Sequence, residues 1–233
     1  MEPTPLASYN RLWSFFKPFA VLYLHSRAWR GREDKKRLRE RYGHYAQERP
    51  KGQLFWLHAV SVGESIAALN LATCLREIQP DLNILITTNT HTAARRIAEQ
   101  GDSVILHGYQ PLDHPQWVAR FLDHWQPNHA IMLESDFWPN LICATAARGI
   151  PLCFASAQLS DNAYQAWQKR VHLARTIFST PQDIFAVDTH QADKFKNLAD
   201  GKGKKPRILI GGSLKFNPAS LIPNAAMEGM LAD

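Results

Sequence analysis

Seven short apolar runs recur between residues 54 and 212, and a polar turn and a helix-like stretch follow each of the first six. The runs are continuously hydrophobic, as expected for parallel strands that are covered on both faces. Strands alternating with helices predict an α/β fold with a doubly wound, mostly parallel, Rossmann-like sheet. The predicted strands are residues 54–60, 83–88, 104–109, 129–134, 151–157, 183–188 and 207–212, and the predicted helices lie near 64–78, 91–100, 114–124, 139–148, 163–177 and 190–199.

The composition agrees with a folded α/β body. Among 233 residues, 45% are hydrophobic, and 11 Phe, 7 Trp and 6 Tyr supply enough apolar surface to exclude a disordered or collagen-like chain. Three cysteines are too few for a disulfide scaffold, so we expect a reducing compartment. No paired Cys/His spacing indicates a zinc site, and we predict no metal.

The net charge of +6 comes from residues 1–50, which carry 11 basic and 5 acidic side chains, whereas the remaining charges cancel. Residues 12–24 are apolar and aromatic but include Lys17 and Pro18. This run is shorter than the roughly 20 residues that span a bilayer, and no signal-peptide cleavage site follows it. We interpret residues 1–50 as a membrane-proximal, basic amphipathic helical arm that contacts an anionic membrane surface.

Two other interpretations of the arm stay open. It could be an ordinary helix that packs its aromatic side chains on the domain and leaves a solvated basic face. Nucleic-acid binding is less favoured, because no recognised binding motif accompanies the charge, and we predict no nucleic-acid partner.

The loops that follow the predicted strands hold the candidate site, because ligands of doubly wound sheets bind beyond the carboxyl ends of the strands. Converging carboxylates, amides and helix N-termini would form a polar cleft suited to a sugar or phosphate. The candidate residues are Ser61, Gly63, Glu64, Thr88, Glu134, Asp136 and Lys215.

Glu64 has two interpretations. Ser61-x-x-Glu64 is a capping-box pattern, and spacing alone favours that structural role. A carboxylate at the mouth of the sheet would also serve as a general base. Gly63 would let the backbone approach a ligand, and His58, inside an apolar run, is interpreted as a core histidine.

The other candidates also have structural alternatives. Asp136 could cap the helix that Pro139 helps to start. Glu134 ends an apolar run, where a carboxylate needs partners, so a site role and a structural role are equally favoured. Thr88 lies in a Thr-rich loop that would cap a helix and contact ligand occasionally, and Lys215 is either an anion contact or a surface charge.

Several segments together resemble the N-terminal domain of the 3-deoxy-D-manno-octulosonic acid (Kdo) transferases of lipopolysaccharide assembly. The basic segment RLRERYG (37–43) resembles the membrane-proximal start of that family, and the resemblance spans roughly residues 10–217. The matching segments are HAVSVGE (58–64), TTNTHTAA (87–94), PLD (111–113), ESDFWPNL (134–141), GIP (149–151), ASAQLSD (155–161) and GGSLKF (211–216).

This resemblance implies half of a GT-B glycosyltransferase, peripheral or monotopic at the cytoplasmic face of the inner membrane. The N-terminal domain would receive a lipid A precursor as acceptor, and a C-terminal domain would bind most of the CMP-Kdo donor, without a cofactor or metal. Glu64 would be the general base, and Glu134 would lie in the same cleft.

The sequence departs from the family pattern in three places. Gln158 stands where Arg is expected, and Asp136 replaces the more usual Glu. We expect residues 218–233 to form a tail that starts no second domain. We therefore expect a membrane arm (1–50), a Rossmann-like acceptor-binding domain (51–217) and a tail. The chain would bind CMP-Kdo and transfer Kdo only together with a C-terminal domain or a partner chain.

Two alternatives to an enzyme half remain. The chain could be a non-catalytic, membrane-associated module derived from that domain that binds glycolipid, which the Gln158 departure and the missing donor half would favour. An unrelated nucleotide-binding Rossmann domain is less favoured, because no GxGxxG fingerprint follows the first predicted strand.

Overall fold

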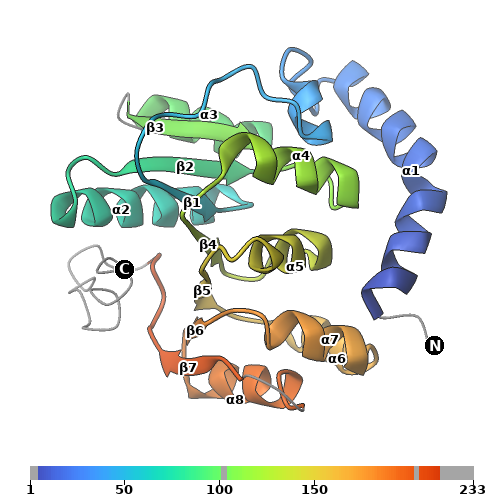
Figure 1. The fold of residues 1–233 in the computed structure, drawn as a ribbon, viewed down its shortest axis with the longest axis vertical. Helices are drawn as coiled ribbons and strands as arrows, with labels where there is room; N and C mark the ends of the chain where they lie inside the picture. The colour runs from blue at the N-terminus through green and yellow to red at the C-terminus, as the bar shows by residue number, and fades with distance from the viewer. Residues whose placement is uncertain (1–4, 101–103, 202–204, 216–233) are drawn as a thin grey trace.

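The computed structural model of the chain describes residues 5–100, 104–201 and 205–215. Seven strands form one parallel sheet in the order β3-β2-β1-β4-β5-β6-β7 (Figure 1). All seven predicted strands are confirmed, with ends within a few residues of the expected positions. The strands are β1 (Leu54–His58), β2 (Asn83–Thr88), β3 (Ile105–Tyr109), β4 (His129–Leu133), β5 (Leu152–Ala157), β6 (Asp183–Ala186) and β7 (Arg207–Ile210).

Helices cover both faces of the sheet, which confirms the doubly wound α/β class (Figure 1). Alternate residues of each inner strand enter different cores: Trp56 packs on one face with Phe121, whereas Phe55 and Leu57 pack on the other. The helices α2 (Val62–Ile78) and α3 (His91–Gln100) cover one face, and α4 (Pro115–Trp125), α5 (Pro139–Ala147), α7 (Val171–Phe178) and α8 (Thr189–Leu198) cover the other.

The order of the strands reverses between β1 and β4. From β1 the chain builds outward to β2 and β3, then returns to place β4 on the opposite side of β1. Helices that leave neighbouring strands in opposite directions open a crevice at the carboxyl ends of those two strands. The loops after β1 and β4 are therefore the place where this fold brings ligand-binding groups together.

One predicted helix is two helices. Residues near 163–177 form α6 (Asp161–Gln168) and α7, separated at Arg170, whose backbone is not helical (φ −116°, ψ 47°). The break has a packing reason, because α6 buries no residue, whereas α7 buries Ile177 and Phe178. The change of direction lets Phe178 pack edge-on against Phe154 in the core.

The N-terminal arm contains a long helix, α1 (Pro5–Trp29), and a short 3-10 helix, η1 (Leu38–Tyr42). The first turns of α1 lie against the starts of α4 and α5, where the Tyr9 hydroxyl donates to Asp113 and the Trp13 ring meets Trp117 edge-on. Among the described helices, none is long and apolar enough to cross a membrane. The predicted tail, 218–233, lies outside the described residues.

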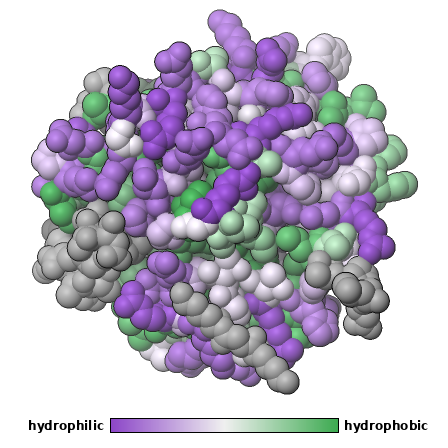
Figure 2. Space-filling view, viewed as in Figure 1, coloured by the Kyte–Doolittle hydropathy of each residue, from purple (hydrophilic) through white to green (hydrophobic). Residues whose placement is uncertain are grey.

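The outer surface of α1 is apolar along most of its length. Figure 2 shows hydrophobic residues at the edge of the molecule that α1 forms. A group of large apolar side chains is costly to leave in water, so this surface indicates a contact with another apolar surface. Its exposed large side chains are Leu12, Phe15, Phe16, Phe19, Leu22, Tyr23 and Trp29.

Candidate functional site

Glu64 stands in the first turn of α2, directly after β1. The Ser61 hydroxyl accepts from the Glu64 backbone N–H (3.3 Å), and Glu64 Oε2 accepts from the backbone N–H groups of Val60 (2.6 Å) and Ser61 (3.4 Å). The predicted capping box is thus confirmed. Glu64 is 7% exposed, and its Oε1 accepts no hydrogen bond from the described residues. Capping therefore engages one carboxylate oxygen and leaves the other for chemistry.

Glu134 follows β4, the strand beside β1, and is also buried. Its backbone has φ +61°, a left-handed conformation that residues other than glycine seldom adopt. The carboxylate lies 2.7 and 2.9 Å from Lys215 Nζ and accepts from the Gln158 amide at 3.1 Å. These two contacts supply the partners that a buried carboxylate needs. Strain held by such contacts is typical of functional sites.

Lys215 joins the two carboxylate loops. A Cβ atom added at Gly63 would lie 3.3 Å from Lys215 Cε, so the lysine chain crosses the N-terminus of α2. The segment after β7 is held there because the Leu214 N–H donates to the Ser156 hydroxyl (2.9 Å) at the end of β5. The structure thus brings the loop of Ser61, Gly63 and Glu64 together with Glu134 and Lys215.

Asp136 belongs to a neighbouring cluster. Its Oδ2 accepts from Trp138 Nε1, from His58 Nε2 at 3.1 Å and from Asn89 Nδ2 at 3.2 Å. His58 is fully buried with both ring nitrogens in contact, the other with Thr87 Oγ1 at 2.9 Å, which confirms it as a core histidine. This cluster ties together the ends of β1, β2 and β4.

The prediction that Asp136 caps α5 is wrong. The N-cap position is Trp138, which makes no side-chain capping bond. Asp113, from the loop after β3, instead accepts from the Asn140 N–H (3.0 Å) and the Leu141 N–H (2.8 Å). The three donors on Asp136 hold it away from the helix start, and a carboxylate distant in the sequence takes its place.

Thr88 is not brought into the Glu64 group. It is buried, and its hydroxyl lies 3.0 Å from His107 Nε2. Arg37 Nη1 lies 2.8 Å from the other ring nitrogen of His107. Burial and the Arg37 charge lower the pKa of His107 to about 3, so the ring is neutral and accepts from Arg37. A ligand contact by Thr88 therefore stays a prediction.

Sequence patterns did not reveal two buried polar residues at the same edge of the sheet. Arg41 belongs to the charge run of the arm, yet it is buried and donates to the backbone oxygen of Gln110 at 2.7 Å. Gln110 itself, after β3, is 1% exposed. No spacing rule singles out either residue, because the contact joins segments far apart in the chain.

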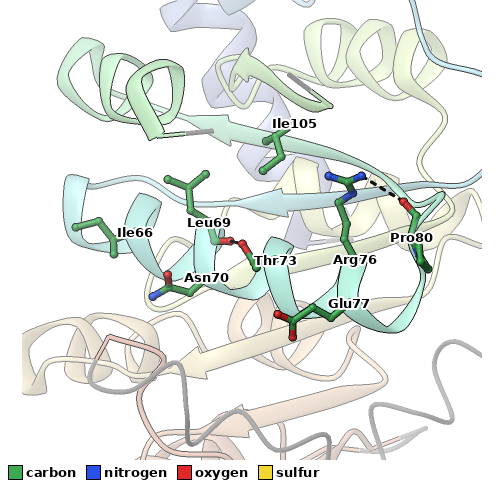
Figure 3. Close-up of a pocket in the computed structure, with 8 residues that line it drawn as sticks. All are labelled: Ile66, Leu69, Asn70, Thr73, Arg76, Glu77, Pro80 and Ile105. Carbon is green, nitrogen blue, oxygen red and sulfur yellow. Dashed lines mark hydrogen bonds between the residues drawn. The ribbon is translucent and has the colours of Figure 1, made fainter. Parts of the chain in front are cut away.

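A separate cavity of about 530 Å³ runs along the flank of α2. Figure 3 shows Leu69, Thr73 and Arg76 along the helix, with Ile105 of β3 across from them. Since its wall comes from the length of α2 and not from the loops after the strands, this cavity is not part of the Glu64 group. In the described part of the chain, no group of three or more His, Cys, Asp or Glu side chains could hold a metal ion.

Comparison with known proteins identifies the family. The profile of the 3-deoxy-D-manno-octulosonic-acid transferases matches residues 36–218. The chain belongs to this family of transferases. A probable mitochondrial 3-deoxy-D-manno-octulosonic acid transferase of Arabidopsis thaliana is 40% identical over 82% of the chain and 43% of its own length, and the transferase of Haemophilus influenzae is 35% identical over 88% and 50%. The chain spans about half the length of these relatives.

Solved structures agree with the fold. The UDP-GlcNAc 2-epimerase of Neisseria meningitidis, bound to UDP-GlcNAc, aligns with a TM-score of 0.51 over 77% of this chain and 53% of its own, at 13% identity. S. aureus MnaA with UDP aligns with the same score over 76% and 51%. At such low identity, these likenesses concern the Rossmann-like fold only.

Proposed function

We propose that this Kdo transferase chain supplies the acceptor-binding half and the general base for transfer of Kdo from CMP-Kdo to a lipid A precursor. The observation that carries the proposal is the position of Glu64 at the strand-order reversal, with one oxygen held by backbone N–H groups. The nearby Glu134–Lys215 pair supplies charged groups that would position substrate. Ser61, Gly63 and Asp136 would complete the acceptor side of the cleft.

The reaction needs a base and a leaving group. Glu64 Oε1 would take the proton of an acceptor hydroxyl while that oxygen attacks the anomeric carbon of Kdo. The bond from this carbon to the phosphate oxygen of CMP breaks, and CMP leaves with the electron pair. The α2 N-terminus favours a negative carboxylate at this position. A positioned base contributes roughly 10²- to 10⁴-fold to such a rate.

The Glu64→Gln variant tests the base separately from the cap. Glutamine serves at the third position of a capping box, so the helix start should survive while proton abstraction is lost. We expect CMP release from CMP-Kdo with a lipid A precursor to fall at least about 100-fold. The assay mixes this chain with the C-terminal half of the Haemophilus influenzae relative. Unchanged turnover in Glu64→Gln would show that Glu64 is not the base.

Ser61→Ala is the matched control for that variant. It removes the side-chain cap, at a cost of about 0.5–2 kcal/mol in stability, but leaves the carboxylate. We expect its kcat to stay close to that of the unaltered chain, because the base remains, and the loss to fall on the KM for the acceptor. Assays of the chain without the added half should show little transfer, because the donor would lack most of its binding groups. Glycolipid binding without transfer in the mixture would favour the non-catalytic module.

We also propose that α1 places the chain on the cytoplasmic face of the inner membrane as a peripheral or monotopic protein. The support is the row of exposed aromatic and aliphatic side chains on α1, next to a strongly basic segment. Apolar side chains that enter the headgroup region and cations that attract anionic lipids act together at such surfaces.

A further inference from the structure

The three hydrogen bonds of Asp136 all meet on one of its two carboxylate oxygens. Trp138 Nε1, His58 Nε2 and Asn89 Nδ2 each donate to Oδ2. Oδ1 accepts no hydrogen bond from the described residues, and the Asp136 side chain is 23% exposed. The carboxylate therefore has one anchored oxygen and one oxygen that remains for a ligand.

The Thr87 hydroxyl determines which nitrogen of His58 carries the proton. Thr87 is fully buried, and its Oγ1 accepts from Trp56 Nε1 at 2.7 Å and lies 2.9 Å from His58 Nδ1. Because an indole nitrogen only donates, the hydroxyl proton of Thr87 finds its acceptor, among the described residues, in His58 Nδ1. A proton on Nδ1 would leave the Thr87 proton buried without a partner, which is rare in native proteins. His58 is therefore a neutral ring whose Nε2 proton points at Asp136.

Arg41 determines the orientation of Asn89 by the same rule. Arg41 Nη1 donates to Asn89 Oδ1 at 2.8 Å. Because a guanidinium group only donates, the Asn89 amide turns its oxygen toward Arg41 and its Nδ2 toward Asp136. The third donor, the Trp138 indole, has no acceptor nitrogen at all. All three donors are thus fixed without a ligand, and so is the orientation of the carboxylate that they hold.

Asp136 lies at the reversal of the strand order, where the proposed site is. It follows β4, and His58 is the last residue of β1, the strand beside it. A network that only joined the strand ends would have no need to leave a carboxylate oxygen open at this edge. An ionised carboxylate accepts hydrogen bonds and donates none, so the partner of Oδ1 is a donor such as a sugar hydroxyl.

We infer that His58 is a positioning residue, which holds Asp136 so that Oδ1 accepts a hydroxyl of the acceptor sugar. The inference rests on the proposed function, because it takes the acceptor as the ligand. It adds to that function the acceptor contact of Asp136 and the buried hydroxyl of Thr87 that orients it. His58 is fully buried and acts through Asp136 without touching the ligand.

Nuclear magnetic resonance tests the positioning of Asp136 without a variant or a ligand. Long-range proton–nitrogen correlation spectra show which nitrogen of a histidine ring is protonated. We expect His58 near neutral pH to carry a proton on Nε2 and none on Nδ1. A proton on Nδ1, in a neutral or a charged ring, would overturn the inference.

Calorimetric titration of the chain tests the contact with the ligand. The probe is a diacylated glucosamine disaccharide in detergent micelles. Asp136→Asn should weaken binding at least about tenfold, because a hydrogen bond to a charged group is lost. Thr87→Val removes the hydroxyl that orients His58 and should weaken binding at least about threefold, whereas Thr87→Ser keeps a hydroxyl and should bind as the unaltered chain does. In the Asp136→Asn background, Thr87→Val should cause no further loss.

Thr145→Val is the matched control for Thr87→Val. Thr145 is also fully buried, and its hydroxyl donates to the Leu141 carbonyl at 2.7 Å within α5. Its removal should leave binding unchanged, and an equal loss in both variants would overturn the inference. A probe with methylated sugar hydroxyls has no proton to donate, so the unaltered chain and Asp136→Asn should bind it equally.

Two further results would overturn the inference: unchanged binding of the first probe by Asp136→Asn, or losses in Thr87→Val and Asp136→Asn that add in the double variant. If Thr87→Val fails to fold, the protonation of His58 and the titration of Asp136→Asn still decide. All these outcomes leave the proposed function standing. Absence of probe binding by the unaltered chain would instead refute the acceptor-binding function, and this inference with it.

Discussion

Lys215 contacts residues of both candidate loops, Glu134 and Gly63. By itself, Glu134 is a carboxylate at the end of an apolar strand, where an unpaired charge would be costly. Lys215 pairs with it at 2.7 Å and at the same time crosses Gly63 at the start of α2. Lys215 therefore connects the two candidate loops through its ion pair with Glu134 and its contact at Gly63.

We predict that Lys215→Met destabilises the chain by about 1–3 kcal/mol. Breaking a buried ion pair costs about 3–5 kcal/mol, and the loss is smaller here because the lysine side chain is 35% exposed. Urea unfolding measures the difference. Lys196→Met, which removes an exposed pair with Asp193 at 3.0 Å, is the matched control and should cost at most about 1 kcal/mol. Equal effects of both variants would contradict a structural role for the Glu134 pair.

At the scale of elements, η1 covers the edge strand β3. Glu40 accepts from the Tyr109 N–H at 2.8 Å, and the Tyr45 hydroxyl donates to the Tyr109 carbonyl at 2.6 Å. Unpaired edges invite pairing with other chains, so these contacts protect the sheet. Arg37 adds a contact with His107 in the same strand. Part of the basic arm is thus a structural cover, whatever α1 does at a membrane.

The His107 contact predicts how stability depends on pH. The pKa of His107 is about 3 in the folded chain and about 6.5 in the unfolded chain. Between these pH values the unfolded state binds a proton at His107 and the folded state does not. The contribution of His107 is fully present above pH 6.5 and is lost toward pH 3, by up to about 1.4 kcal/mol per pH unit. Urea unfolding from pH 4 to 7 should show that the free energy of unfolding rises less steeply with pH in His107→Asn than in the unaltered chain. Identical slopes would contradict a neutral His107 in the folded state.

At the scale of the whole molecule, α1 presents one apolar stripe to the outside. Phe15, Leu22 and Trp29 follow one another at seven-residue intervals and are 68%, 68% and 81% exposed. Residues at this spacing lie on nearly the same face of a helix. None of the three lines the groove that Leu12, Trp13, Phe16 and Phe19 form on the same helix, so this stripe tests membrane contact by itself.

We predict that the triple variant Phe15→Ser, Leu22→Ser, Trp29→Ser reduces binding to vesicles of anionic phospholipid at least about 100-fold. Each large apolar side chain contributes roughly 1.5–3 kcal/mol when it leaves water, and a tenfold change corresponds to about 1.4 kcal/mol. Vesicle flotation measures the loss. Val171→Ser, an exposed residue on α7, should bind as the unaltered chain does. Undiminished binding by the triple variant would rule out α1 as the membrane contact.

Features that depend on residues close together in the chain are predictable from the sequence. Continuous apolar runs specify the inner strands, because a parallel strand inside the sheet is buried on both faces. The edge strands β3 and β7 have similar runs although they are partly exposed. The capping box at Ser61 and Glu64 forms within one helical turn, so its spacing predicts it. The segments HAVSVGE and ESDFWPNL also carry the family resemblance in the sequence alone.

Which distant side chains meet depends on the three-dimensional fold. The Lys215–Glu134 pair joins residues 81 positions apart, and Arg41 reaches the Gln110 backbone across 69 positions. Asp113 rather than Asp136 caps α5, because His58 and Asn89 hold the latter elsewhere. Such contacts depend on the order of the strands and on what each buried polar group finds as a partner, and no local pattern encodes either.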